Sequence, residues 1–505
     1  MDPSQHQTLF QALRLQRDEA AWTRLARQMA SSFVDHCYYS DHYEPTYIQL
    51  LCEMAMGLPD PAVNDLGAAA LFGIIEELCD DYEDFQFDTY SRVMAQIIDY
   101  CRRLPQGRRL DDQLRAFGLD DSEDLLERAR RVRRPPAAMS RQRPVDRVIV
   151  LSRVTIGAEV AIVSVMVQRI LQAYPGADVL ILGDEKAARL FAGHERVRVR
   201  PVAYPRHGGL GQRFDAWHAL LAVLAEEIPS RAASGTLVVD PDSRLSQLGM
   251  LPLGDDRSYL YFDSHDTSHH LRQMSMAGLA NDWLDNVLGP GEFSYPRVWP
   301  AAALSGQAGT LLAALRRQGS EQIVTVNFGV GHNERKRLGI EFEIGLVRRL
   351  LEHPRTTVIL DQGFGPEELE AARTIRAAVH AAGKAALKAR FDCAADWILA
   401  GGLLAVSCDI GQMAALIGGS DEFIGYDSAC QHIAAALQIP TISVFAGTNS
   451  PRFIRRWKAC SVAPNTIVHV NAFRRGGIAD ASEVVDRILQ ERSGKGRKPL
   501  RDATL

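Results

Sequence analysis

The sequence lacks the features that define several large classes of protein. Its eight cysteines are scattered, with no Cys-x-x-Cys pair and no histidine partners at zinc-ligand spacing. They therefore indicate buried thiols of a reducing compartment, not a disulfide framework or a structural zinc site. Residues 1–17 contain no apolar signal core, and no run of about 18 or more apolar residues stands out. These absences predict a cytoplasmic protein.

A strong excess of charge of either sign is also missing. The chain has 57 Lys and Arg against 62 Asp and Glu, a formal net charge of -5. This balance argues against a nucleic-acid binder, which needs a basic face. One basic stretch lies at residues 128–143 and is interrupted by Pro135 and Pro136. A solvated linker is the simplest interpretation, and peripheral contact with an anionic membrane surface is the alternative.

The length of 505 residues is too great for one hydrophobic core and predicts about three folding units. Over residues 1–134 apolar side chains recur at helical spacing with few β-branched runs, which predicts an all-helical domain. Residues 135–145, rich in proline and arginine, are expected to be a linker. Residues 493–505 are expected to form a disordered tail.

Short apolar runs alternate with helical segments from residue 146 onward. The run RVIVL at 147–151, a helix expected at 159–173 and the run DVLIL at 178–182 form a βαβ unit, so the sheet should be parallel. Residues 146–315 and 316–492 each carry such a series. The further strands are expected at 197–202, 235–240, 259–262, 323–327, 357–360, 404–407, 422–426 and 441–445.

This alternation predicts an α/β protein with two Rossmann-like, doubly wound domains after the all-α domain. Ligands of such domains bind at the carboxyl ends of the strands and in the cleft between the two halves. The acceptor side is assigned to the first half and the nucleotide side to the second.

The most informative motif lies at 421–456. A strand ends at Tyr426, Asp427 and Ser428 form a helix N-cap, and a helix of small apolar residues begins near Ala429. Free backbone N–H groups and the positive end of the helix dipole make this a site for a diphosphate. Ser428 and His432, one helical turn apart, add side-chain donors on the same face.

This motif resembles the family 9 glycosyltransferases, whose best-known members are ADP-heptose:lipopolysaccharide heptosyltransferases. The matching residues, in order, are Asp427, Ser428, His432, Pro440, Thr441, Phe445, Thr448 and Pro451. The sequence departs from the family pattern at Ala429, where glycine is usual, and at Ala446-Gly447, where the glycine is displaced by one. The all-helical domain is outside the usual family architecture.

The resemblance implies a GT-B fold and an inverting, metal-independent transfer of a sugar, such as a heptose, from a nucleotide-diphosphate donor. An ADP-sugar is the favoured donor, no cofactor is needed, and the acceptor is a glycan, a lipid-linked group, a protein or a small molecule. Self-association through the helical domain remains open.

A weaker part of the resemblance lies upstream, in NFGVGHNERKR at 327–337. The family has a Gly-rich loop here with a lysine that contacts the donor diphosphate. Gly329 and Gly331 permit close backbone approach, and Lys336 neutralises phosphate charge. With Asn333, Asp427, Ser428, Ala429 and His432, these residues form the predicted donor site.

The family places its catalytic carboxylate in a Gly-Asp dipeptide after the first strand. Here the run is Gly157-Ala158-Glu159, so the carboxylate is a Glu one position later. Glu159 is the candidate base that takes the proton from an acceptor hydroxyl. The equally weighted alternative is a glutamate that only complements the helix dipole.

Two polar loops of the first half are candidates for the acceptor side, and tight turns with surface arginines are an equally good interpretation. The candidate residues are Arg206, Arg213, Asp242 and Arg244. A cluster of Asp and His at 263–270 looks like a metal site, but a solvated loop is favoured and no metal is predicted.

Two other functions fit the same patterns. A sugar-nucleotide epimerase or hydrolase uses the same architecture, because fold alone does not fix the reaction. A non-catalytic protein that acts through its helical domain is the second alternative.

Overall fold

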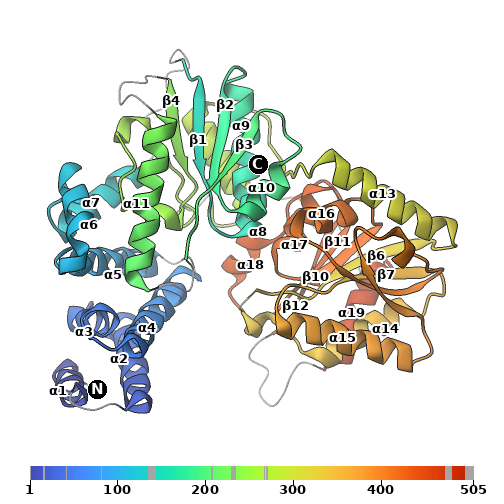
Figure 1. Ribbon diagram of the computed structural model, residues 1–505, viewed down its shortest axis with the longest axis horizontal. Coiled ribbons are helices and arrows are strands. Elements are labelled where there is room, and N and C mark those ends of the chain that lie inside the picture. The colour runs from blue at the N-terminus through green and yellow to red at the C-terminus, as the bar shows by residue number, and fades with distance from the viewer. Residues whose placement is uncertain are drawn as a thin grey trace.

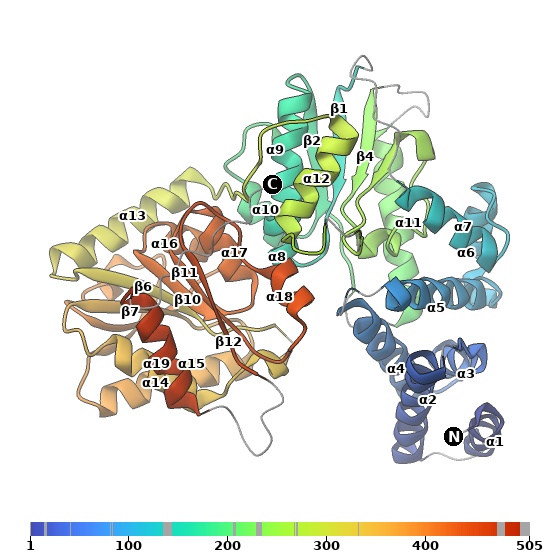
Figure 2. The ribbon, with the colours of Figure 1, turned by 180° about the vertical axis from the view of Figure 1, so that it is seen from behind.

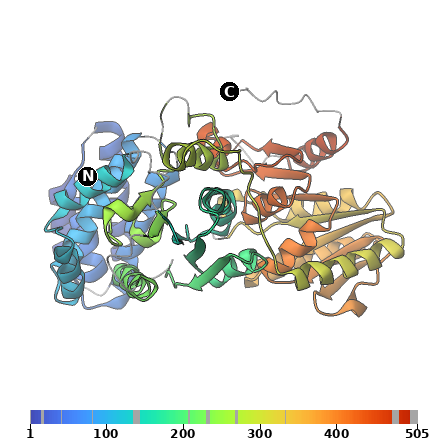
Figure 3. The same ribbon diagram turned by 90° about the horizontal axis from the view of Figure 1, so that it is seen from above.

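The computed structural model describes residues 2–14, 18–40, 42–80, 82, 84–134, 144–205, 209–228, 235–266, 268, 271–331, 333–471 and 480–494. They form a helical region (2–134), an N-lobe (144–301) and a C-lobe (302–494). The N-lobe lies between the other two regions (Figure 1, Figure 3).

The helical region consists of helices that begin at proline or acidic caps. Glu44 caps its helix by accepting from the Thr46 N–H, and Asp121 accepts from the N–H groups of Glu123 and Asp124. The helices are α1 (Pro3–Leu13), α2 (Glu19–Ser40), α3 (Pro45–Met56), α4 (Pro61–Asp80), α5 (Asp84–Arg102), α6 (Arg108–Ala116) and α7 (Ser122–Arg133).

The N-lobe contains a parallel sheet in the order β3-β2-β1-β4-β5. Its strands are β1 (Arg147–Leu151), β2 (Asp178–Gly183), β3 (Val197–Pro201), β4 (Thr236–Asp240) and β5 (Tyr259–Tyr261). Its main helices are α8 (Ile156–Ala158), α9 (Ser164–Ala173), α10 (Glu185–Phe191), α11 (Leu210–Glu227) and α12 (Met276–Leu288). The strand order reverses between β1 and β4, so a ligand site is expected at their carboxyl ends.

The C-lobe contains a parallel sheet in the order β12-β11-β10-β6-β7-β9-β8. Its strands are β6 (Gln322–Asn327), β7 (Thr356–Asp361), β8 (Ala386–Arg390), β9 (Gly402–Ser407), β10 (Glu422–Tyr426), β11 (Thr441–Phe445) and β12 (Asn465–His469). Its helices are α13 (Ala302–Arg317), α14 (Ile340–Leu350), α15 (Pro366–Ala381), α16 (Ile410–Gly418), α17 (Ala429–Ala436), α18 (Pro451–Trp457) and α19 (Ala481–Arg492). The predicted fold class is confirmed.

The helical region shares a hydrophobic core with the N-lobe. Side chains alternate along β1: Ile149 and Leu151 belong to the same hydrophobic cluster as Leu125 of α7. Val148 and Val150, on the other face, belong to the cluster that contains residues of α9 and α12. The front view shows α11 over one face of this sheet (Figure 1), and the back view shows α9 and α12 over the other face (Figure 2). The helical region therefore completes the covering of the sheet.

Two details differ from the sequence expectations. The helix expected from Glu159 begins at Ile156 and passes through a π-helical stretch, η2 (Glu159–Val163), before α9. Helix α13 crosses the expected domain boundary after residue 315 and packs on α16 of the C-lobe.

One helical stretch, Ile156–Ala173, has the length and apolar composition of a membrane span, which was not expected from the sequence. Two thirds of it is buried inside the N-lobe, as is usual for a core helix of a globular protein.

Candidate functional site

The predicted donor residues gather at the reversal point of the C-lobe sheet. Strand β6 ends at Asn327, and its neighbour β10 ends one residue before Asp427, with Gly425 paired to Asn327. Helix α17 then starts at this edge and packs against α8 of the N-lobe. A Cβ added to Gly157 would lie 3.3 Å from Cδ2 of His432 and 3.7 Å from Cα of Ala429. The start of α17 therefore faces the loop that follows β1, as Figure 1 shows.

Lys336 and Asp427 form a largely buried ion pair. The Lys336 Nζ lies 2.6 Å from Oδ2 of Asp427 and also donates to its main-chain carbonyl at 3.3 Å. Gln431 donates to the other carboxylate oxygen at 2.7 Å. Burial raises the pKa of Asp427, and Lys336 partly offsets this by favouring the ionised form. The pair joins the predicted Gly-rich loop to the start of α17.

Ser428 occupies the N-cap of α17, yet its side chain makes no capping bond. Its Oγ is buried and has no hydrogen-bond partner among the described residues. A buried hydroxyl without a partner costs free energy unless something outside the chain bonds to it. Together with the free N–H groups of the first turn, it fits an anion at this helix end.

His432 is buried one turn further along α17. Burial, and after it the charge of Lys336, lowers the pKa of His432 to about 4. The imidazole is therefore neutral at pH 7 and offers one N–H donor. Its ring contacts Trp457 edge-on, with 6.0 Å between ring centroids.

The Gly-rich loop at 327–337 lies close to Gly447, the glycine that is displaced by one position from the family pattern. Gly331 and Gly447 both adopt the left-handed region, with φ values of 64° and 78°. A Cβ on Gly447 would lie 2.5 Å from the carbonyl oxygen of Arg335, so only glycine allows this approach. Asn333 is exposed on the loop. The glycine at position 447 therefore allows the Gly-rich loop to lie close to the residues that follow β11.

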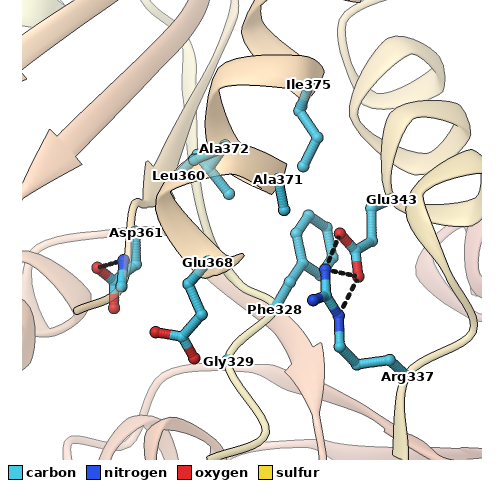
Figure 4. A pocket seen from close by; sticks show the side chains of 11 residues that line it. Phe328, Gly329, Arg337, Glu343, Leu360, Asp361, Glu368, Ala371, Ala372 and Ile375 are labelled. Atoms are coloured by element: carbon cyan, nitrogen blue, oxygen red, sulfur yellow. Dashed lines mark hydrogen bonds and ion pairs between the residues drawn. The ribbon is translucent and has the colours of Figure 1, made fainter. Parts of the chain in front are cut away.

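Behind this loop lies a small cavity of about 20 Å³ (Figure 4). Phe328 and the Arg337–Glu343 ion pair line one side, and Gly329, Asp361 and Glu368 line the other. Burial raises the pKa of Asp361 to about 6. The volume is enough for about one water molecule and too small for a nucleotide.

Glu159 lies inside the N-lobe and is only 1% exposed. Ser152 donates to its Oε1 at 2.5 Å, while the buried Oε2 has no hydrogen-bond partner among the described residues. Burial raises the pKa of Glu159 to about 7, which is near the range useful for a general base. The same Ser152 hydroxyl accepts from the N–H of Val154, a β-branched residue at φ 69°. Such strained backbone is common at functional sites.

Glu159 also opens the π-helical stretch. A π-helix accommodates one extra residue in a turn and is frequent at functional sites. The one-position displacement of the carboxylate from the family pattern thus coincides with a local change of helix geometry.

The predicted acceptor-side residues have interior surroundings where the structure describes them. The guanidinium of Arg213 lies 3.2 Å above the ring of Phe72 in α4 and donates to the Tyr204 hydroxyl. Arg213 is buried, so the alternative of a surface arginine fails at this position. Arg244 is half-buried, and Arg206 lies outside the described residues.

Asp242 is fully buried and organises a polar network after β4. It pairs with Arg153 at 3.0 Å and with His265 at 3.2 Å. Burial acts to raise the pKa of Asp242, but Arg153 and then His265 hold it well below its usual range. Tyr261 and Ser264 also donate to its carboxylate. These bonds join the loop after β4 to Arg153, which follows β1, and to Tyr261, Ser264 and His265 at the end of β5 and in the loop after it.

The expected polar cluster at 263–270 forms no metal site within the part of the chain that the structure describes. His265 is committed to Asp242, and His269 and His270 lie outside the described residues.

The contacts that helix α18 makes with the helical region and the N-lobe were not predicted from the sequence. Arg452 and Trp457 contact the helical region through Tyr82, and the buried Arg456 contacts the N-lobe. Arg452 and Arg456 belong to the motif at 421–456 and Trp457 follows it directly, but only the three-dimensional structure shows their partners.

Comparisons with known proteins show which family model and which solved structures the chain resembles. Residues 384–472 match the model of glycosyltransferase family 9 (heptosyltransferase), and this segment contains Asp427, Ser428 and His432. No curated protein matches the sequence. The family 9 glycosyltransferase of Veillonella parvula DSM 2008 is similar in structure, with a TM-score of 0.51 and 14% identity, over 71% of this chain and 98% of that chain.

Two Escherichia coli structures are also similar. ADP-heptose lps heptosyltransferase II has a TM-score of 0.46 and 15% identity, over 68% of this chain and 99% of that chain. Heptosyltransferase WaaC with ADP has a TM-score of 0.43 and 17% identity, over 68% of this chain and 99% of that chain. The resemblance is confirmed: the chain has the two Rossmann-like lobes of the GT-B fold after a helical region, and residues 384–472 match the model of glycosyltransferase family 9 (heptosyltransferase).

Proposed function

We propose that the protein transfers a sugar from a nucleotide-diphosphate donor to an acceptor hydroxyl, with inversion at the anomeric carbon and without a divalent ion. The observation that carries this proposal is the start of α17. There a largely buried Lys336–Asp427 pair stands beside the Ser428 hydroxyl, whose Oγ has no hydrogen-bond partner among the described residues. Asp427 and Ser428 belong to the segment that matches the family model, and Lys336 lies upstream of it. An ADP-sugar, with heptose as the sugar, is the donor that the family resemblance favours.

The donor half of the mechanism is stabilisation of the leaving diphosphate. Backbone N–H groups at the start of α17, the Ser428 hydroxyl and the ammonium of Lys336 supply hydrogen bonds and positive charge where negative charge develops. Neutral His432 adds a donor without the cost of a buried charge. The charge of Lys336 and these fixed hydrogen-bond donors together stand in for the stabilisation that a metal ion would otherwise supply.

Glu159 is the proposed base for the acceptor half. The acceptor oxygen attacks the anomeric carbon from the face opposite the diphosphate, its proton passes to Oε2 of Glu159, and the carbon–oxygen bond to the diphosphate breaks. Because Glu159 is 1% exposed, contact with substrate requires the loop 152–157 to shift. The strained Val154 is the natural hinge for that shift.

We also propose the reducing cytoplasm as the compartment. The cysteines whose side chains the structure describes are free thiols, and most of them are buried.

A product assay separates this function from its two rivals. Purified protein is incubated with ADP-, UDP-, GDP- and CDP-sugars and a panel of acceptors, with and without EDTA, and the nucleotide and sugar products are analysed. Transfer predicts acceptor-dependent release of a nucleoside diphosphate that EDTA does not reduce. An isomerised donor without release would indicate an epimerase, release without an acceptor product a hydrolase, and no consumption of any donor a non-catalytic protein.

A further inference from the structure

One residue of the helical region, Tyr82, is buried where all three regions of the protein meet. It lies between α4 and α5 and is only 5% exposed. The C-terminal end of α4 points toward α18 in both the front and back views (Figure 1, Figure 2). Tyr82 packs in the same hydrophobic cluster as the N-lobe and C-lobe helices, whereas the rest of the helical region packs in another.

Helix α18 of the C-lobe holds Tyr82 at two points. The indole Nε1–H of Trp457 donates to the Tyr82 hydroxyl at 2.7 Å, and the guanidinium of Arg452 donates to the Tyr82 carbonyl oxygen. One bond is to the side chain and the other to the main chain, so position and orientation are both fixed.

The N-lobe holds the other side of the same residue. The ring of Tyr82 stacks on the imidazole of His265, with 5.0 Å between centroids and 27° between planes. His265 is fixed by Asp242 at 3.2 Å and also stacks on Phe87 of α5. Tyr82 thus joins the loop after β5 to α18 across the two lobes.

Its backbone conformation shows that these contacts are required. Tyr82 has a φ of 57°, in the left-handed region that residues other than glycine seldom adopt. Such a conformation persists only when its surroundings fix it more strongly than the strain opposes it.

The contacts of Tyr82 continue into the predicted donor site. Gln431 donates to the carbonyl oxygen of Trp457 at 3.2 Å and to Asp427 at 2.7 Å. The indole ring of Trp457 also contacts His432. Arg456, one residue before Trp457, donates to the carbonyl oxygens of Asp266 and Leu271 in the N-lobe. The helix that Tyr82 holds is therefore the helix that supports the donor residues.

We propose that Tyr82 is a positioning residue through which the helical region holds α18, and with it the start of α17, in the closed arrangement of the lobes that binds the donor. Its effect on the donor rests on the proposed function. The latch itself, defined as the contacts of Tyr82 with Trp457, Arg452 and His265, exists without any ligand and can be measured separately.

Hydrogen exchange of the full-length protein without ligand tests the latch. Tyr82→Phe keeps the stacked ring but leaves the Trp457 indole without its acceptor. Amides of α18 and of the loop 263–266 should exchange about tenfold faster, as expected for the loss of one buried hydrogen bond. Tyr39→Phe is the matched control, because Tyr39 in the same region is 86% exposed. Unchanged exchange of α18 in Tyr82→Phe would overturn the proposal.

A double-mutant cycle distinguishes the loss of the Tyr82–Trp457 hydrogen bond from a general loss of structure. Trp457→Phe removes the same hydrogen bond from the C-lobe side, so the effects of Tyr82→Phe and Trp457→Phe on exchange should not add. Fully additive effects would mean that the two residues act independently and would refute the latch.

Steady-state kinetics measure the effect of Tyr82→Phe on donor binding. Donor KM should rise about tenfold in Tyr82→Phe while kcat changes less than about twofold, because saturating donor restores the closed arrangement. If the wild-type protein binds no nucleotide but exchange changes as stated, the latch stands and the proposed function fails. If the wild-type protein transfers sugar but KM and exchange in Tyr82→Phe equal those of Tyr39→Phe, the latch fails and the proposed function stands.

Discussion

The carboxyl of Glu159 combines a raised pKa of about 7 with one oxygen that lacks a partner in the described structure. If it is the base, Glu159→Gln should lower the rate of transfer by about 10²- to 10⁴-fold, the range for loss of general base catalysis. Donor affinity should not change, because the hydrogen bond of the Glu159 side chain in the described structure is with Ser152 and not with a donor residue. Single-turnover kinetics with a calorimetric measurement of donor binding would show this. Normal turnover in Glu159→Gln would remove Glu159 from the mechanism.

The same pKa makes a prediction about stability. Glu159 binds a proton more tightly in the folded state, so its contribution to folding is full below its ordinary pKa of 4.5 and is lost as the pH rises to about 7. Between pH 5 and pH 8 the wild-type protein should lose about 2 kcal/mol relative to Glu159→Gln. Urea unfolding at both pH values measures this, with exposed Asp178→Asn as control. A constant difference would contradict the buried, protonatable carboxyl.

Lys336 has separate effects on stability and on binding. Lys336→Met leaves the buried Asp427 carboxylate without its cation, and the free energy of unfolding should fall by about 2 to 3 kcal/mol. The double variant Lys336→Met, Asp427→Asn should recover most of that loss but should still bind nucleoside diphosphates poorly. Recovery of binding in the double variant would show that the ammonium does not contact the diphosphate.

At the scale of elements, the contact of α8 with α17 depends on a glycine. The Cβ of Gly157→Ala would lie 3.3 Å from Cδ2 of His432, so the buried His432 ring, or helix α17 with it, must shift by a few tenths of an ångström. We expect a loss of about 1 kcal/mol and weaker nucleotide binding. Gly306→Ala in α13 is the control, because its Cβ meets nothing within 4 Å and alanine favours helix. Equal melting temperatures for the two variants would show that α8 and α17 do not meet as described.

Elements with strong local signals were predictable from sequence, and those set by tertiary packing were not. Buried runs such as RVIVL and DVLIL form β1 and β2, and the Asp427 motif forms a strand, a cap and a helix. The edge strands β8 and β12 were missed because an edge strand is partly solvated and reads as a polar loop. The pairing of Lys336 with Asp427 was not predictable either, since it joins residues 91 positions apart.

At the scale of the whole molecule, the helical region is part of the structure of the N-lobe. Its side chains cover the face of the sheet that carries Ile149 and Leu151, and Arg128 of α7 reaches Asp256 at 3.0 Å. Periodicity identifies such helices but does not show which surface they cover. A chain of residues 144–505 should therefore aggregate or unfold, because it exposes a large apolar face. Circular dichroism and size-exclusion chromatography, with the full-length protein as control, test this. A soluble, cooperatively folding fragment would contradict it.

The central claim is that the start of α17 binds the diphosphate of a nucleotide sugar. Calorimetric titration of the full-length protein with ADP, UDP, GDP and CDP, in buffer containing EDTA, tests it most directly. We expect saturable binding of ADP in preference to the other three, with at least tenfold weaker binding to Ser428→Ala, the equivalent of about 1.4 kcal/mol. If protein shown to be folded binds none of these diphosphates, the start of α17 is not a donor site, and the helical region becomes the candidate functional part.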